Sequence, residues 1–231
     1  MGGSQAVVDY VRKGGVMPPN DESLHIADDG SFTMWRSAST ASIPPSPVGE
    51  FAGKLTQPQH EQLAAAASLL DAAGDLSLTP PPGAVIETIR VAGATASLGI
   101  HQQAPGPWDQ LIKLLRPLLG ELTRFPKAAL RLEMNDQGRS ARLVAVGHGA
   151  LELDLGEMQV HAFLWRGDQI DARWSAPTES ETRRETTGDG WNLSLPFDHG
   201  FELNRDVRVS AIVELKASLD DETMRAISLQ V

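Results

Sequence analysis

The side chains best suited to metal binding and acid–base chemistry in this chain are its six histidines, and their spacing forms no recognisable catalytic motif. None lies in an HExxH sequence, and no two are four residues apart, the spacing that would put both on one face of a helix. The chain has no cysteine, which excludes disulfides, thiolate metal ligands and a cysteine nucleophile. The sequence therefore predicts no metal centre and no cofactor.

Serine and carboxylate chemistry has equally little support in the sequence. There is no G-x-S-x-G turn to expose a nucleophilic serine, and His199 follows Pro196 in a predicted turn rather than beside a nucleophile. The carboxylates of "ELDLGE" alternate as they would on a solvated sheet face, and "GATASLG" lacks the lysine of a phosphate-binding loop. We predict that the protein is not an enzyme.

The charge balance limits the class of partner. Lys and Arg total 20 and Asp and Glu total 30, so the formal net charge is -10, with no basic cluster in either half. Nucleic acids and anionic membrane surfaces both attract clustered positive charge, so neither is expected as a partner. No run approaches the roughly 20 apolar residues that cross a bilayer, and the first twenty residues lack a secretory signal pattern. The prediction is a cytoplasmic protein.

The first half of the chain has the pattern of a small α+β domain. Short alternating runs predict strands at 6–12, 23–27, 31–36, 84–91 and 95–100. Thr56 and Gln59 form a capping-box pattern before a helix that is expected to end at Gly74. A second helix should follow Pro107, with an apolar stripe at spacings of three and four, and should kink or restart at Pro117. These elements predict a small antiparallel sheet with two helices on one face.

From Phe125 onward the hydrophobic period changes from helical to two. Runs such as "ALRLEM", "LELDL" and "VRVSAIVEL" alternate apolar and polar residues, and about eight such strands are expected. This count predicts an all-β sandwich. The predicted domains are therefore 1–124 (α+β) and 125–231 (β-sandwich), with the boundary near Thr123 to Lys127.

The stretch "YVRKGGVMPPNDE" stands out between the first two predicted strands. Gly14 and Gly15 suit a turn that needs positive φ, and Pro18 and Pro19 would hold the residues before them in an extended conformation. Its order with "LHIADDGSFTMWR", the capped helix, "PPPG", "IETIRVAG" and "LIKLLRPLL" resembles the emfourin-like family, small protein inhibitors of thermolysin-type metalloproteases. The resemblance covers about residues 7–119, and the C-terminal half has no counterpart in the minimal members of that family.

The resemblance implies a non-catalytic protease-binding protein whose contact region is the first strand and its glycine turn. The residues that this mapping gives are Arg12, Lys13, Gly14, Gly15, Val16 and Met17. The expected partner is a thermolysin-like metalloprotease, with Val16 and Met17 presented by the stiff tip so that little entropy is lost on binding.

An alternative function is a scaffold or accessory protein that docks a partner through the predicted sandwich. Phe163 and Trp165 lie on the strand face opposite Val160 and Leu164, and together they form the expected contact patch. An enzyme is the third possibility, and it would require a deep pocket with converging polar groups, for which the sequence offers no pattern.

Overall fold

The structure is a computed structural model of the 231-residue chain and is mostly β. It describes residues 6–14, 21–39, 45–91, 93–134, 140–177, 184–186, 191–194, 207–219 and 225–230. These residues belong to two compact units, Met1–Arg36 with Glu50–Phe125, and Ser37–Gly49 with Pro126–Val231. Each unit is described separately below.

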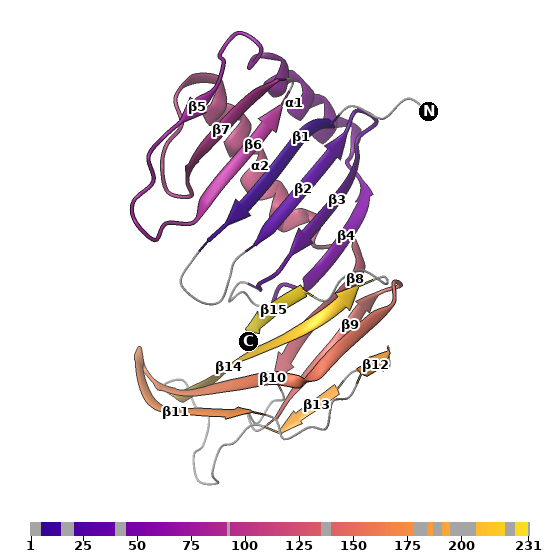
Figure 1. Cartoon of the computed structure of the whole chain (residues 1–231), viewed down its shortest axis with the longest axis vertical. Helices are drawn as coiled ribbons and strands as arrows, with labels where there is room; N and C mark the ends of the chain where they lie inside the picture. Colours follow the sequence, from indigo (N-terminus) through magenta and orange to yellow (C-terminus); the bar gives the residue numbers. More distant parts are fainter. Residues whose placement is uncertain are drawn as a thin grey trace. The chain divides into compact units, whose positions relative to one another are not determined.

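The first unit is a sheet with strand order β4-β3-β2-β1-β6-β7-β5 (Figure 1). Its strands are β1 (Ala6–Lys13), β2 (Glu22–Ala27), β3 (Ser31–Arg36), β4 (Val48–Lys54), β5 (Leu76–Ser77), β6 (Ile86–Val91) and β7 (Ala94–Gly99). The pairs β1–β2, β2–β3, β1–β6 and β6–β7 are antiparallel, and β5 pairs with β7 in parallel. Alternate residues of these strands are buried, as the period-two pattern predicts.

Two helices, α1 (Gln57–Ser68) and α2 (Gly106–Leu122), lie on one face of this sheet (Figure 1). At the start of α1 the Gln59 Oε1 accepts hydrogen bonds from the Thr56 N–H (3.0 Å) and hydroxyl (2.8 Å). The helix ends at Ser68, earlier than the predicted Gly74, and turns complete the segment. Helix α2 continues through Pro117 without restarting. Its buried stripe is Trp108, Leu111, Ile112, Leu115, Leu118, Leu119 and Leu122.

All named elements after Phe125 are strands. They are β8 (Pro126–Met134), β9 (Ser140–Gly147), β10 (Leu151–Arg166), β11 (Gln169–Pro177), β12 (Arg184–Thr186), β13 (Trp191–Ser194), β14 (Val207–Leu219) and β15 (Arg225–Gln230). Strands β11, β10, β14 and β15 form one sheet in that order, and β12 also pairs with β10. Strand β9 pairs with β8 on one side and with β13 on the other.

The predicted fold class, a small N-terminal α+β sheet followed by a separate all-β sandwich, is wrong. The hydrogen-bonded order of the larger sheet is β13-β9-β8-β4-β3-β2-β1-β6-β7-β5, so strands from both halves of the sequence belong to one sheet. Strand β4 was not predicted from the sequence. It lies between β8 and β3 in this order and spans the boundary between the two units. Gly49 and Gly53 interrupt its alternation, and Gly49 has φ 137°, so the usual strand pattern is absent from "VGEFAGK".

Candidate protein-contact site

The connection between β1 and β2, residues 14–21, is called the contact loop below. Lys13 ends β1, and both Lys13 and Gly14 are exposed. Gly14 has φ 110°, a conformation that other residues rarely adopt. The other predicted contact residues of the loop lie outside the described residues: Gly15, Val16 and Met17.

A row of four charged side chains crosses the sheet at the base of this loop. Arg12 is opposite Glu22 of β2 on one side and opposite Glu87 of β6 on the other. Glu22 is in turn opposite Arg36 of β3. The signs therefore alternate across four strands in the order Glu87, Arg12, Glu22, Arg36, so that each neighbouring pair attracts. This set is called the charge row.

The charge row is buried and closely paired. Arg12 Nη1 lies 3.1 Å from Glu22 Oε2, and its Nη2 donates to Glu87 Oε1 at 3.2 Å. Arg36 Nε donates to Glu22 Oε1 at 2.7 Å. The side chains of Glu22 and Glu87 are 1% and 0% exposed. Charges this far from water persist in proteins only when partners of opposite sign bond them.

Helix α2 packs against the charge row and bonds to two of its members. Arg116 donates to Glu87 Oε2 from Nη2 at 2.7 Å and from Nε at 3.3 Å. Arg36 Nη2 donates to the backbone oxygen of Leu119 at 3.3 Å. That carbonyl is one of the last four of the helix, which have no partner within it, and a cation there also interacts favourably with the helix dipole. The row thus fixes the last turns of α2 against the ends of four strands.

Tyr10 completes the arrangement by donating from its hydroxyl to Glu87 Oε1 at 2.9 Å. Burial, together with the nearby glutamates, raises the pKa of Tyr10 well above its ordinary value of 10.0. Burial alone would lower the pKa of Arg12, but Tyr10, Glu22 and Glu87 raise it. The phenol therefore stays protonated at neutral pH. Both Glu87 oxygens accept hydrogen bonds. Glu22 accepts from Arg36 at Oε1, whereas its Oε2, 3.1 Å from Arg12 Nη1, has no hydrogen-bond donor among the described residues. The chemistry of this cluster is structural.

The charge row gives Arg12 a structural role in addition to the contact role that the family resemblance implies. Its side chain is only 15% exposed, because the guanidinium bridges Glu22 and Glu87. Arg12 and Glu22 are opposite each other on the two strands that the contact loop connects. Their pairing consequently holds both ends of the loop at a fixed separation.

The second predicted patch lies on β10 in the other unit. Val160 and Leu164 are buried, while Phe163 and Trp165 are partly exposed on the opposite face, so the structure brings the two predicted residues together. The Arg173 guanidinium lies 6.0 Å from the centroid of the Phe163 ring. Trp165 Nε1 donates to Ser210 Oγ at 2.8 Å. Neighbouring strands thus hold both aromatic side chains.

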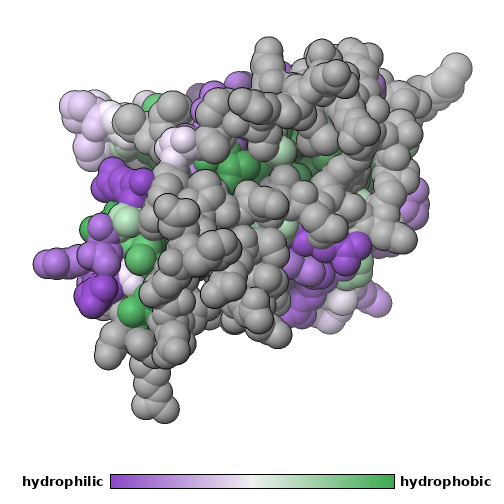
Figure 2. All heavy atoms as spheres, turned by 90° about the horizontal axis from the view of Figure 1, so that it is seen from below, coloured by the Kyte–Doolittle hydropathy of each residue, from purple (hydrophilic) through white to green (hydrophobic). Residues whose placement is uncertain are grey.

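Large hydrophobic side chains are exposed at three described positions, Leu69 (51%), Ile86 (37%) and Phe125 (49%). All three belong to the first unit. Phe125 makes an edge contact with the Phe32 ring at 5.9 Å, whereas Ile86 is the first residue of β6, directly opposite Lys13. On the face drawn in Figure 2, the described hydrophobic residues form separate patches beside hydrophilic ones.

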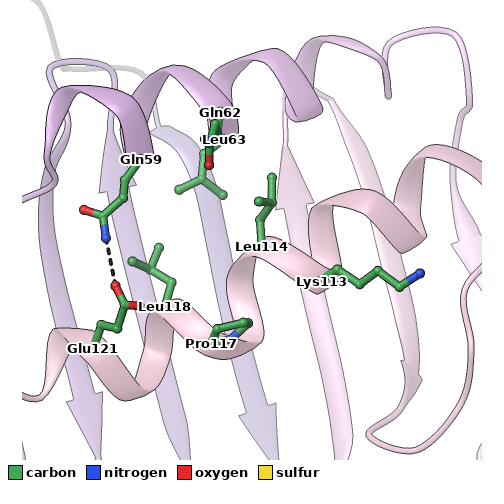
Figure 3. Close-up of a pocket in the computed structure, with 8 residues that line it drawn as sticks. All are labelled: Gln59, Gln62, Leu63, Lys113, Leu114, Pro117, Leu118 and Glu121. Carbon is green, nitrogen blue, oxygen red and sulfur yellow. Dashed lines mark hydrogen bonds between the residues drawn. The ribbon is translucent and has the colours of Figure 1, made fainter.

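A groove between α1 and α2 has a volume of about 190 Å³ (Figure 3). Gln59 of α1 donates to Glu121 of α2 across one end at 2.9 Å. The ammonium of Lys113 points away from the groove in Figure 3 and bonds to Asp109 at 2.6 Å. The lining contains no converging acid and base, so the groove lacks the arrangement of a catalytic pocket.

Two further findings concern the described residues alone. No group of three or more His, Asp or Glu side chains there is placed to hold a metal ion. Within the same part of the chain, neither helix has the length and apolar character needed to traverse a lipid bilayer.

Sequence reasoning missed Glu22, Arg36, Glu87 and Arg116 as parts of the site. A signal was present, because the three strand residues occupy the parity of core positions such as Ile89, with opposite signs on neighbouring strands. The strand order, which the sequence did not provide, is needed to recognise that these residues form a row.

Comparisons of the chain with protein-family models, with curated proteins and with solved structures found no match.

Proposed function

We propose that this chain is a non-catalytic protein-binding protein that inhibits a thermolysin-like metalloprotease through its contact loop. The glycine pair and proline pair of the loop, together with the resemblance to emfourin-like inhibitors, indicate a thermolysin-like metalloprotease as the class of partner. The loop would enter the substrate cleft with Val16 and Met17 leading. We expect it to act in the cytoplasm.

The observation that supports this proposal most is the charge row at the base of the loop. The Arg12–Glu22 pair joins the two strands that the loop connects, and Glu87, Arg36 and Arg116 tie this pair to neighbouring strands and to α2. Fixing the ends of a loop before binding reduces the conformational entropy lost in the complex. A loop used for inhibition benefits from such a base because a protease cleft readily cleaves segments that adapt to it.

The proposal is tested by measuring the residual activity of a thermolysin-like metalloprotease titrated with the protein. The wild type is compared with the double variant Val16→Asp/Met17→Asp. The matched control is Ala72→Asp/Ala73→Asp, which adds the same two charges at exposed positions in the α1–β5 connection, at the opposite end of the sheet (Figure 1).

The wild type and the control should inhibit at micromolar concentration or below, and the loop variant should not. Mass spectrometry of the protein recovered from the assay shows whether it is intact, as expected of an inhibitor, or cleaved, as expected of a competing substrate. If the wild type leaves the protease fully active at micromolar concentration, the proposed function is wrong.

A second candidate function is supported by the aromatic pair on β10. Phe163 and Trp165 share one partly exposed face, and Arg173 and Ser210 hold them in place, as expected of an ordered docking patch. With a partner identified by cross-linking, Trp165→Ala should weaken capture at least about tenfold while Met17→Asp leaves it unchanged. The opposite pattern would assign capture to the contact loop.

A further inference from the structure

A second loop of the first unit lies against the start of the contact loop. This loop, residues 79–86 with the sequence "TPPPGAVI", is called the proline turn. A Cβ added to Gly14 would lie 3.3 Å from the backbone oxygen of Ala84 and 3.6 Å from Val85 Cα. Lys13 is paired with Ile86 in the register of β1 and β6. The end of β1 and the proline turn therefore occupy the same end of the sheet (Figure 1).

The proline turn is held in one conformation by its own hydrogen bonds. The N–H of Ala84 donates to the oxygen of Pro81 at 3.1 Å. Pro82 and Gly83, the latter with φ 75°, occupy the central positions, which is the arrangement of a type II turn. Each end of the turn is also fixed to neighbouring backbone, because Gln102 Nε2 donates to Thr79 O at 2.9 Å and the Ile100 N–H donates to Val85 O at 3.0 Å.

The surface of this turn has the composition of a protein contact. Residues 76–86 contain no Asp, Glu, Lys or Arg in a chain where 22% of residues are charged. Pro81 and Pro82 are exposed, and Ile86 is one of the three exposed large hydrophobic side chains. Buried centres of protein interfaces are depleted in charged residues, and a rigid loop loses little entropy when it is covered.

We infer that the proline turn is the second half of the contact surface and that it packs against the rim of the cleft that the contact loop enters. The inference rests on the proposed function, since the occupant is the same thermolysin-like metalloprotease. Gly14 joins the two halves: its lack of a side chain lets the backbone at residues 84–85 approach the start of the contact loop. Binding by the proline turn beside the contact loop would also fix the orientation of the inhibitor in the cleft.

The test uses the same protease titration with charges placed on the proline turn of the full-length protein. Ile86→Glu should raise the apparent inhibition constant at least about tenfold, because a carboxylate would replace the apolar side chain in the covered surface, and its desolvation there would exceed what pairing with Lys13 on the opposite strand returns. Pro82→Glu changes another exposed residue of the turn and should act in the same direction. It also provides a second test if Ile86→Glu disturbs β6, which the thermal unfolding midpoint will reveal.

The matched control is Leu69→Glu, the same substitution at an exposed hydrophobic residue after α1. It should change the inhibition constant by no more than about twofold, as expected for a residue outside the interface. Inhibition that is unaffected by Ile86→Glu and Pro82→Glu, but lost in Val16→Asp/Met17→Asp, would overturn this inference and leave the proposed function intact. An equal loss in Leu69→Glu would overturn it as well. A wild type that does not inhibit would overturn both proposals.

Discussion

Replacing Glu87 with glutamine tests whether the charge row holds the end of the sheet. Glu87 is fully buried and accepts hydrogen bonds from Tyr10, Arg12 and Arg116. Glutamine keeps the size of the side chain and one acceptor oxygen, but it loses the charge and directs an amide donor toward cationic donors. The substitution therefore leaves buried Arg12 with only one of its two carboxylate partners.

The expected cost follows from the burial of these groups. Removing one partner of a buried ion pair costs roughly 3–5 kcal/mol. The Arg116 side chain is 34% exposed, so water can replace part of its bond and the Glu87→Gln cost should lie at the low end, about 3 kcal/mol. The control is Asp109→Asn on α2, whose partner Lys113 is 73% exposed. That pair should be worth at most about 1 kcal/mol.

Urea unfolding followed through the backbone amide NMR signals of β1 and β6 measures both variants. The signals of β10, in the other unit, serve as an internal reference, because neither substitution touches that strand. A Glu87→Gln cost of about 1 kcal/mol or less, indistinguishable from the control, would refute the argument that the row anchors the contact loop.

Three further predictions concern the same unit. Tyr10 is the only tyrosine, and because its pKa is raised in the folded protein, the unfolded chain loses the phenolic proton at a lower pH. The free energy of unfolding should therefore fall above pH 10 by up to about 1.4 kcal/mol per pH unit. Tyr10→Phe should remove this component from the pH dependence of unfolding. Gly14→Ala should cost roughly 1–3 kcal/mol because φ is 110°, and it should speed amide exchange at Ile86. Leu111 is a fully buried residue of α2, and Leu111→Ala should lower the free energy of unfolding by about 2–5 kcal/mol in urea titrations.

The sequence was informative wherever one residue pattern decided the structure. Strands β2 and β3 and the apolar stripe of α2 follow from periodicity, and Trp108 is in the core as its place on that stripe predicts. Strand β4 shows the limit of such patterns. Its glycines remove the alternation, and its place in the sheet depends on pairing with strands distant in the sequence, which no local pattern records.

The candidate site could be predicted only in part for a related reason. The contact loop was identified from its glycines and prolines, and Arg12 was assigned to the partner because the emfourin-like resemblance maps the contact region onto the first strand and its glycine turn. The parity of Arg12 with Tyr10 pointed the other way, toward the core. Recognising that Glu22 and Glu87 flank it required the strand order, which is a tertiary property.

Apolar residues at the positions of the charge row would give similar stability, and the register of β1 and β2 explains why charged residues occupy them instead. Buried ion pairs add little net stability over well-packed hydrophobic residues, so their contribution here is specificity. A shift of β1 by one residue would move Arg12 to the other face of the sheet, and a shift by two would place it opposite Leu24. Either shift would separate Arg12 from Glu22, which would keep only Arg36 as a partner. Either error would also change the length of the contact loop. The charge row therefore specifies the one register in which the loop has eight residues and in which Gly14 lies against the proline turn.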